Sequence, residues 1–329
     1  MKNKIPIIVM IDVEPDGFFI DRNKPLPWKG FEGLCPFFSD WRKSLEQATG
    51  EKAHFSWFVS LDPQVEETYG SAMWPLTQYE NQVRSFEKEG DEIGLHPHAY
   101  RWEPKHNDWV EDREDQRWVN YCTEMAFAAY KKALNRTCKS FRFGAAWINN
   151  ETMNFAHRLG AEIDLSIEPK FKLETFPYLT DKKKYSGIYP DLDDVPSFPY
   201  QKAEHDFKTP VQNGNGNLWV IPQTIGNVQY RYGRLEWLQK RLFAPQLLKP
   251  FDLTLKLTTT QKFFIQIVEE QLKGERPYIT IALRSDVGQP TKFMKQVISN
   301  SNYLATHPLA KRFVFATPGE ALKILGLKE

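Results

Sequence analysis

Three carboxylates directly follow a short apolar run near the start of the chain. The run Ile5–Ile11 leads into Asp12, Glu14 and Asp16. Residues 12 and 14 are two apart, so their side chains share one side of an extended backbone. One such carboxylate can bind a metal ion while its neighbour acts as a base. The competing interpretation is a polar loop whose carboxylates face water.

Two histidines form a second cluster at the end of another apolar run. The segment Glu92–His98 is typical of a strand, and His96 and His98 stand two apart at its end. Pro97 between them cannot donate a ladder hydrogen bond, which fits a strand end. Two neutral imidazoles that face one point can chelate a divalent ion. The competing interpretation is a pair of partly exposed histidines with backbone partners.

A set of two histidines and a carboxylate, with an open position for water, fits zinc, so zinc is the expected cofactor. Manganese and cobalt are the alternatives. A metal ion of this type lowers the pKa of bound water and polarises a carbonyl group. A neighbouring carboxylate can then take the proton of that water. The chemistry expected from the two clusters together is therefore metal-assisted hydrolysis.

Strand-like apolar runs alternate with amphipathic helical stretches along most of the chain. We expect strands at residues 5–12, 55–60, 92–98, 140–144, 163–167, 218–222, 278–283 and 312–316. We expect helices at residues 77–89, 113–134, 151–159, 258–273 and 317–325. This alternation predicts a mostly parallel sheet, and seven or eight such units favour an α/β barrel over an open sheet. The carboxyl ends of barrel strands open onto the face that carries active sites.

We expect a single domain over residues 1–329. A stretch from about residue 168 to 208 breaks the alternation, because it is rich in Pro, Asp, Lys and Tyr and shows no clear period. Unstructured stretches of this length in compact domains are usually functional or irregular. We therefore interpret it as a long excursion and not as a linker between two domains.

Charge and cysteine content exclude several classes of partner and location. The chain has 43 basic and 42 acidic residues, so its net charge does not indicate binding to nucleic acid or to an acidic membrane. The N-terminal apolar run meets Asp12 at once, unlike a signal peptide, and no other run is long enough to span a bilayer. The three cysteines are widely spaced, with no CxxC, which favours a reducing compartment. We expect a soluble cytoplasmic protein without membrane insertion.

In their order along the chain, several short motifs resemble those of the polysaccharide deacetylases, the NodB-homology fold of carbohydrate esterase family four. The matching runs are DVE at 12–14, WFV at 57–59 and GDEIGLHPH at 90–98. Further matching runs are FRFG at 141–144, DLS at 164–166, and FATP at 315–318 followed by EAL at 320–322. Each run is short, but together they span nearly the whole chain.

This resemblance implies a fold, a reaction and four residue roles. The implied fold is a distorted (β/α) barrel of about seven strands, and the implied reaction is hydrolysis of an N-acetyl, less often an O-acetyl, group on a sugar. Asp12 matches the catalytic base of the family, and Arg142 matches the arginine that orients this base. Glu14 and His96 match metal ligands.

Two positions depart from the family pattern. The usual histidine motif is His-x-x-x-His, but position 100 is Tyr100, so His98 is expected to replace the second histidine ligand. The family also has a Leu-x-His motif on its last barrel strand, whose histidine is the general acid, and Ser285 stands in its place. Either another group protonates the leaving amine, with His106 and His205 as candidates, or the activity is changed or lost.

Further residues are expected to contact the substrate. Aromatic rings suit a sugar site, because they offer a broad apolar face. The expected contacts are Tyr100, Trp102, Trp147, Asp164, Arg284 and Asp286. The competing interpretations are core packing for the tryptophans and a surface ion pair of little energy for Arg284 and Asp286.

Three functions are compatible with these residues. The first is a metal-dependent deacetylase that acts on a glycan or a glycan precursor, with a carbohydrate as its partner. The second is another metal-dependent carbon–nitrogen hydrolase that acts on a small amide, since a fold does not fix its substrate. The third is a non-catalytic carbohydrate-binding relic that lost its general acid. An open groove lined by aromatic residues favours a glycan, and a small closed pocket favours a small amide.

Overall fold

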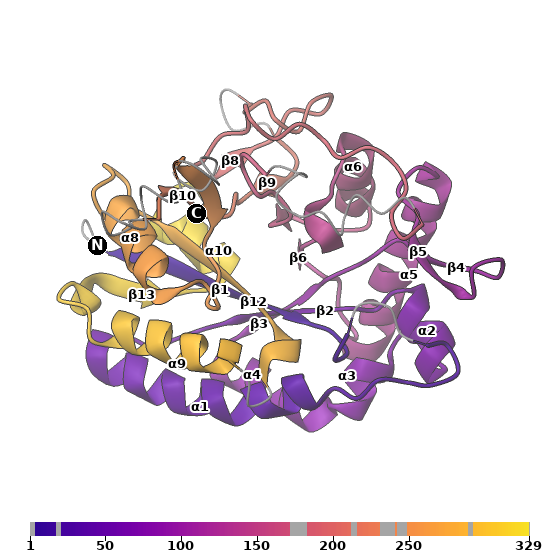
Figure 1. The fold of residues 1–329 in the computed structure, drawn as a ribbon, viewed down its shortest axis with the longest axis horizontal. Helices are drawn as coiled ribbons and strands as arrows, with labels where there is room; N and C mark the ends of the chain where they lie inside the picture. The colour runs from indigo at the N-terminus through magenta and orange to yellow at the C-terminus, as the bar shows by residue number, and fades with distance from the viewer. Residues whose placement is uncertain are drawn as a thin grey trace.

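A curled, mostly parallel sheet forms the centre of the computed structural model (Figure 1), which describes residues 4–17, 21–171, 183–211, 216–230, 241, 249–288 and 292–328. Its strands run in the order β12-β1-β2-β3-β6-β7-β9-β8, and β13 pairs with the first residues of β1. Their bounds are β1 Ile5–Val13, β2 Ser56–Val59, β3 Glu92–Leu95, β6 Ser140–Phe141, β7 Ile163–Asp164, β8 Tyr200–Gln201, β9 Trp219–Val220, β12 Ile279–Arg284 and β13 Phe313–Phe315. Among the pairings that the described residues form in this sheet, only that of β8 with β9 is antiparallel.

The central strand β1 is buried on both faces of the sheet. All nine of its residues are buried, as expected for a strand with layers on both faces. Its register places Asp12 between Phe58 on β2 and Arg284 on β12. The carboxyl ends of the strands therefore meet at one face, as in a barrel.

Hydrogen bonds between the two ends of the strand order curl the sheet into a distorted barrel. Beyond β9, the backbone N–H of Thr224 donates to Oγ1 of Thr280 on β12 over 2.6 Å. Lys256 forms a parallel bridge with Ala282, and the N–H of Leu257 donates to the carbonyl oxygen of Ala282 over 2.8 Å. The predicted α/β class and distorted barrel are confirmed.

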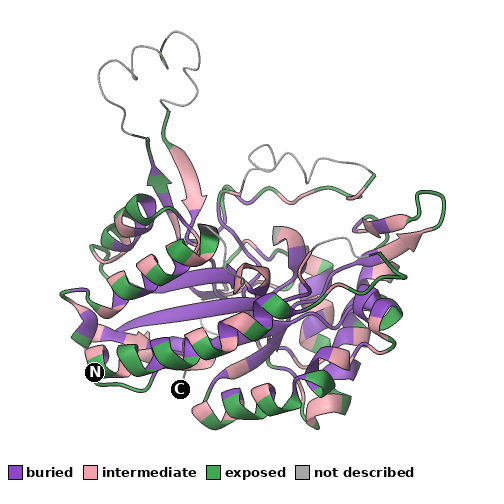
Figure 2. Ribbon diagram, turned by 60° about the horizontal axis from the view of Figure 1, so that its bottom comes forward, coloured by how far each residue is buried: buried purple, intermediate pink, exposed green. Residues whose placement is uncertain are grey.

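Helices cover the outside of this sheet, with polar faces toward solvent and apolar faces toward the strands (Figure 2). Their bounds are α1 Lys29–Thr49, α2 Pro63–Tyr69, α3 Trp74–Gln78, α4 Glu80–Glu89, α5 Gln116–Leu134, α6 Asn150–Arg158, α8 Gln261–Gln271, α9 Lys292–Ala305 and α10 Pro318–Ile324. The predicted terminal helix begins with a complete capping box between Thr317 and Glu320. Among the described helices, none combines the length and the apolar character that crossing a bilayer requires.

The longest helix, α1, is not predicted by the local sequence. Pro36 lies inside it, and Trp28 at its N-cap makes no side-chain capping hydrogen bond. Both features normally argue against a helix. Tertiary packing decides the outcome, because the helix buries an apolar stripe against the sheet. This stripe consists of Phe31, Leu34, Phe38, Trp41 and Leu45.

Two antiparallel hairpins lie outside the predicted alternation. One joins β4 (Tyr100–Glu103) to β5 (Asp108–Glu111), and the other joins β10 (Ile225–Val228) to β11 (Phe251–Thr254). Within the expected excursion at 168–208, the described residues carry the short strand β8, and residues 172–182 lie outside the described ranges. All three cysteines are unpaired, as their spacing predicted.

Candidate functional site

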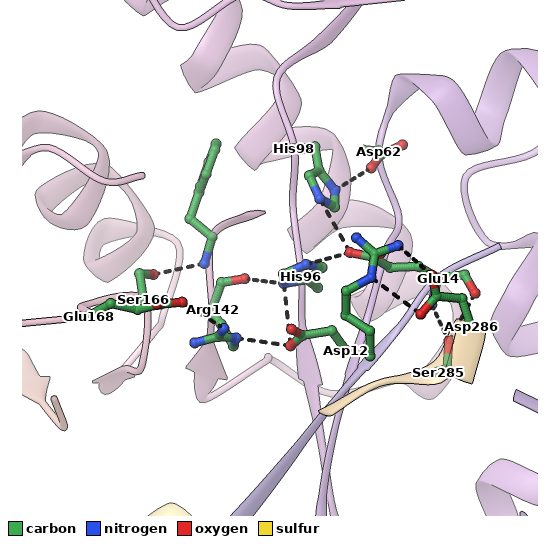
Figure 3. A network of polar contacts seen from close by, with 12 residues as sticks. Asp12, Glu14, Asp62, His96, His98, Arg142, Ser166, Glu168, Ser285 and Asp286 are labelled. Atoms are coloured by element: carbon green, nitrogen blue, oxygen red, sulfur yellow. Dashed lines mark hydrogen bonds and ion pairs between the residues drawn. The ribbon is translucent and has the colours of Figure 1, made fainter. Parts of the chain in front are cut away.

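The carboxyl ends of β1, β3, β6 and β12 bring most of the predicted site residues into one cavity of about 300 Å³. Figure 3 shows the polar contacts that connect many of these side chains. The polar residues that line it are Asp12, Glu14, His96, His98, Tyr100, Arg142, Glu168, Tyr185, Lys256, Thr258, Arg284 and Asp286. The four strand ends supply groups far apart in the sequence, which is what a parallel barrel allows.

Glu14, His96 and His98 form a buried cluster suited to a metal ion. Their ligand atoms all lie within 4.8 Å of one another. Oε1 of Glu14 lies 2.7 Å from Nε2 of His96 and 3.4 Å from Nε2 of His98. Nδ1 of His96 lies 2.7 Å from the carbonyl oxygen of Arg142, to which only its N–H can donate, so Nε2 is the ring nitrogen that faces Glu14. Two imidazoles and one carboxylate fit a divalent ion with a position left for water.

Asp62 fixes the second histidine and is a site residue that the sequence analysis missed. Its Oδ2 lies 2.9 Å from Nδ1 of His98, which directs Nε2 of that ring toward Glu14. Its Oδ1 accepts from the N–H of Val65 and caps α2. A carboxylate behind a metal-binding histidine is the usual arrangement for holding such a ring. The sequence did contain a signal for Asp62. It comes shortly after the predicted strand 55–60, just as Asp12 comes at the end of the first apolar run.

Removal of the Asp62 side chain is expected to weaken metal binding. Asp62→Ala removes the hydrogen bond that orients the ring of His98, and loss of such a supporting group typically costs 10–100-fold in metal affinity. Competition of the protein with a chromogenic chelator for zinc measures this loss. Asp115→Ala is the matched control, because Asp115 caps α5 in the same way but lies outside the cavity lining. Equal zinc affinities of the two variants would contradict a supporting role for Asp62.

Two neighbours confine the ring of His98. Tyr100 stacks on it with ring centroids 4.8 Å apart and an angle of 21° between the planes. A Cβ atom on Gly144 would lie 2.0 Å from Cδ2 of His98, so only glycine leaves room for the ring. Tyr100, which stands where the sequence resemblance expects a second histidine, thus packs against His98.

Asp12 is held beside the cluster by a buried arginine. Nε of Arg142 donates to Oδ1 of Asp12 over 2.9 Å, and Nη1 donates to the carbonyl oxygen of Leu165 over 3.0 Å. Nη2 lies 3.6 Å from Oε1 of Glu168. Both Asp12 and Arg142 are about 5% exposed, and Asp12 lines the cavity. A carboxylate fixed in this way is well placed to act as a base on a cavity water.

Arg284 neutralises the other side of Glu14. Its Nη2 lies 2.9 Å from Oε2 of Glu14 and 3.2 Å from Oδ2 of Asp286. Burial raises the pKa of Glu14, but Arg284 and hydrogen bonds from His96 and His98 outweigh burial and hold it well below its usual range. Burial lowers the pKa of His98, but hydrogen bonds to Asp62 and Glu14 raise it to about 10. The carboxylate of Glu14 is therefore held in its ionised form, as a metal ligand must be.

Ser285 forms hydrogen bonds with the backbone of Glu14 and does not line the cavity. Its hydroxyl accepts from the N–H of Glu14 and donates to the carbonyl oxygen of the same residue, both over 3.0 Å. A Cβ atom on Gly30 of α1 would lie 2.3 Å from the carbonyl oxygen of Ser285, so α1 touches this segment through glycine. The serine at the position of the family's general acid is thus fully engaged in holding Glu14.

Three of the expected substrate contacts lie outside the cavity lining. Trp102 packs against Trp109 in the β4–β5 hairpin, and Trp147 is buried and donates to the carbonyl oxygen of Ile188. Asp164 is fully buried and binds both the N–H and the hydroxyl of Ser166, and burial raises its pKa to about 7. The substrate contacts assigned to these residues stay predictions. The exposed histidines at positions 106 and 205 do not line the cavity either.

Comparison with known proteins identifies the fold. No protein-family model and no curated protein sequence matches the chain. A solved structure from Parabacteroides distasonis, described as a glycoside hydrolase/deacetylase, aligns with a TM-score of 0.57 at 10% identity, over 99% of this chain and 71% of its own. A structure from Pseudomonas aeruginosa PAO1, described as a polysaccharide deacetylase, aligns with a TM-score of 0.53 at 12% identity, over 98% of this chain and 91% of its own. The Puue allantoinase aligns with a TM-score of 0.52 at 12% identity, over 98% and 90%. The chain shares the fold of these proteins.

Proposed function

We propose that the chain is a divergent polysaccharide deacetylase, which hydrolyses an N-acetyl or O-acetyl group on a glycan or glycan precursor with the help of a zinc ion. The observation that carries this proposal is the Glu14–His96–His98 cluster beside the Asp12–Arg142 pair in one cavity. Similarity of fold to proteins described as deacetylases supports it.

In this proposal each residue has a defined task. Glu14, His96 and His98 would hold the metal ion, which when bound acidifies water and polarises the acetyl carbonyl group. Asp12 accepts the proton of the attacking water, and Arg142 keeps the Asp12 carboxylate aimed into the cavity. Because Ser285 is engaged with the backbone of Glu14, we assign the return of this proton to the leaving group to Asp12.

The two competing functions receive less support. Aromatic residues at the cavity, including Tyr100, Phe171, Tyr185 and Phe293, suit a sugar better than a small polar amide. A binding relic would not be expected to keep a complete ligand cluster and an oriented carboxylate, as this chain does. The three unpaired cysteines support action in a reducing compartment such as the cytoplasm.

Metal dependence of acetate release tests the proposal. The purified protein loaded with zinc is expected to hold about one equivalent and to release acetate from acetylated sugars. A chelator should stop the release, and added zinc should restore it. The His96→Ala, His98→Ala double variant should retain neither zinc nor activity. Zinc binding with turnover of small amides, but of no acetylated sugar, would favour the second function and overturn this one.

A further inference from the structure

A lysine that the proposed chemistry does not use lines the cavity of the candidate site. Lys256 is half-buried and lies on the segment that closes the barrel, where it forms a parallel bridge with Ala282 on β12. The N–H of Leu257 donates to the carbonyl oxygen of Ala282 over 2.8 Å, and the N–H of Ala282 donates to the carbonyl oxygen of Leu255 over 3.2 Å. The backbone that carries Lys256 is therefore fixed to the sheet.

The register of the strands places the start of this side chain just below the candidate base. Ala282 pairs with Met10 on β1, so Met10, Ala282 and Lys256 stand side by side in one layer of the barrel interior. Asp12 lies two residues beyond Met10, and residues two apart on a strand point to the same face. Ala282 has a short side chain and lines the cavity, so it leaves room for the lysine stem. The side chain of Lys256 therefore enters the cavity from below Asp12.

Lys256 belongs to the wall of the barrel that faces the two candidate histidine ligands. Its segment pairs with β12, whereas His96 and His98 follow β3, and β1 and β2 lie between β12 and β3 in the sheet. Closure of the sheet turns these two walls toward each other. A group bound between them can therefore meet the Glu14–His96–His98 cluster on one side and Lys256 on the other.

The charges around the cavity show how Lys256 differs from the two arginines. Of the described residues that line it, four are carboxylates (Asp12, Glu14, Glu168 and Asp286) and three are cations (Arg142, Lys256 and Arg284). Each guanidinium group lies no farther than 3.6 Å from two of these carboxylates. Burial raises the pKa of Glu168, but Lys256 and Arg142 outweigh burial and hold it below its usual value, so Lys256 acts on a carboxylate that Arg142 already shares.

An ammonium group suits the stabilisation of a charge that appears only during a reaction. It carries three N–H donors, so an ammonium group that faces Glu168 can still donate to a ligand in the cavity. Negative charge that develops in a site is stabilised best by donors that the protein has already fixed in place. The backbone of Lys256 meets this condition through its bridge to β12.

We propose that the ammonium group of Lys256 donates a hydrogen bond to the acyl oxygen of the substrate and stabilises the negative charge that this oxygen gains. As water adds to the acyl carbon, the π electrons of the carbonyl bond move to its oxygen, and Asp12 holds the proton that the water loses. When the carbonyl bond forms again, the bond to the leaving group breaks and this proton goes to the leaving group. Lys256 keeps its own proton throughout. This inference rests on the proposed function, because it concerns the acyl group that the cavity would hold.

A purely structural role for Lys256 leads to a different expectation. A lysine that only balances Glu168 would affect stability, and its loss would weaken the binding of charged and neutral ligands alike. A contact made to the developing charge favours the charged, tetrahedral state over the unreacted substrate. Ligands that resemble these two states therefore distinguish the two roles.

Binding of two ligands that differ only at the acyl group tests the proposal. Isothermal titration calorimetry of the zinc-loaded Asp12→Asn variant compares N-acetylglucosamine with its N-methylphosphonyl analogue, which carries a negative charge on a tetrahedral group. Adding Lys256→Gln should lower the affinity for the phosphonyl analogue about 10–100-fold, as expected for a lost hydrogen bond to a charged group. The affinity for N-acetylglucosamine should change little. Lys262→Gln is the matched control, because Lys262 is exposed on α8 and does not line the cavity.

Turnover gives a second measurement. With Asp12 intact, Lys256→Gln is expected to lower kcat for acetate release about 10²–10³-fold, the usual cost of removing a donor to the oxyanion, with little change in KM. The glutamine amide can still donate to Glu168, so the fold should survive, and urea denaturation checks this. Lys256→Arg keeps a cation at this position and should keep most of the affinity for the phosphonyl analogue. An arginine variant as weak as the glutamine variant would overturn the role of the charge.

The outcomes separate this inference from the function on which it rests. Equal losses of affinity for the two ligands, or equal effects of Lys256→Gln and Lys262→Gln, would overturn the contact with the acyl oxygen. Acetate release by Lys256→Gln at the wild-type rate would also overturn it, while leaving the deacetylase function intact. A selective loss of affinity for the phosphonyl analogue, in a protein that releases no acetate, would support the contact and defeat the function.

Discussion

Replacing Asp12 by asparagine is expected to lower kcat for acetate release by about 10²–10⁴-fold, the usual contribution of a positioned general base. The substitution keeps the size of the side chain and an oxygen to accept from Arg142, so the geometry of the pair survives. It removes the only property at issue, the ability to take a proton. Zinc content should stay that of the wild type, because Glu14, His96 and His98 are unchanged.

The control for this variant is another buried aspartate that binds an arginine. Asp91 accepts from Nη2 of Arg42 over 2.7 Å and from the indole N–H of Trp57, far from the cavity lining. Asp91→Asn should lower the free energy of unfolding but leave kcat per folded molecule near that of the wild type. If Asp12→Asn behaves like Asp91→Asn, the carboxylate of Asp12 is structural and the proposed base lies elsewhere.

The candidate site was predictable where polar residues stand at the ends of apolar strands. Asp12, Glu14, His96 and His98 each stand at the end of a buried strand, and a parallel sheet brings all such ends to one face. Arg142 required the family resemblance, because a lone arginine after a short strand has no distinctive spacing. Local pattern and topology together were therefore enough for the centre of the site.

The rest depended on packing that a single sequence does not reveal. Ser285 was expected only as a missing acid, and its bond to the backbone of Glu14 depends on the register of β1 with β12. Helix α1 contradicts its own local signals, because burial of its apolar face outweighs the cost of Pro36. A cavity of about 590 Å³ beside the candidate site is lined by two segments, β11 and the start of α8, whose approach no local pattern predicts.

Replacement of Arg142 by leucine is expected to lower the free energy of unfolding by about 3–5 kcal/mol, because it leaves the buried carboxylates of Asp12 and Glu168 without their shared cation. Urea denaturation measures this loss. Arg84→Leu is the matched control, since the pair of Arg84 with Glu80 is exposed on α4 and its loss should change stability little. Equal losses in the two variants would contradict the role of Arg142 in the buried network.

The loss caused by Arg142→Leu should also depend on pH. Burial raises the pKa of Glu168, but Lys256, Arg142 and a hydrogen bond from Thr254 outweigh burial and hold it below its usual value. Ionised Glu168 thus favours the folded wild type above its unfolded-state pKa of about 4.3, and this contribution is lost as the pH falls through the native pKa. Without Arg142 the contribution is smaller, so the stability difference between wild type and variant should narrow on acidification. A difference that stays constant from neutral to acidic pH would show that Arg142 acts by packing alone.

Arg142→Lys separates the charge of this residue from its geometry. Lysine keeps a cation near Asp12 and Glu168, so much of the stability lost in the leucine variant should return. It cannot donate from two fixed nitrogens to Asp12 and to the carbonyl oxygen of Leu165, as the guanidinium does. We therefore expect Arg142→Lys to have a free energy of unfolding near that of the wild type but a lower kcat. Full recovery of both stability and kcat would mean that charge alone orients Asp12. The two-donor geometry of the Arg142 guanidinium would then have no part in the reaction.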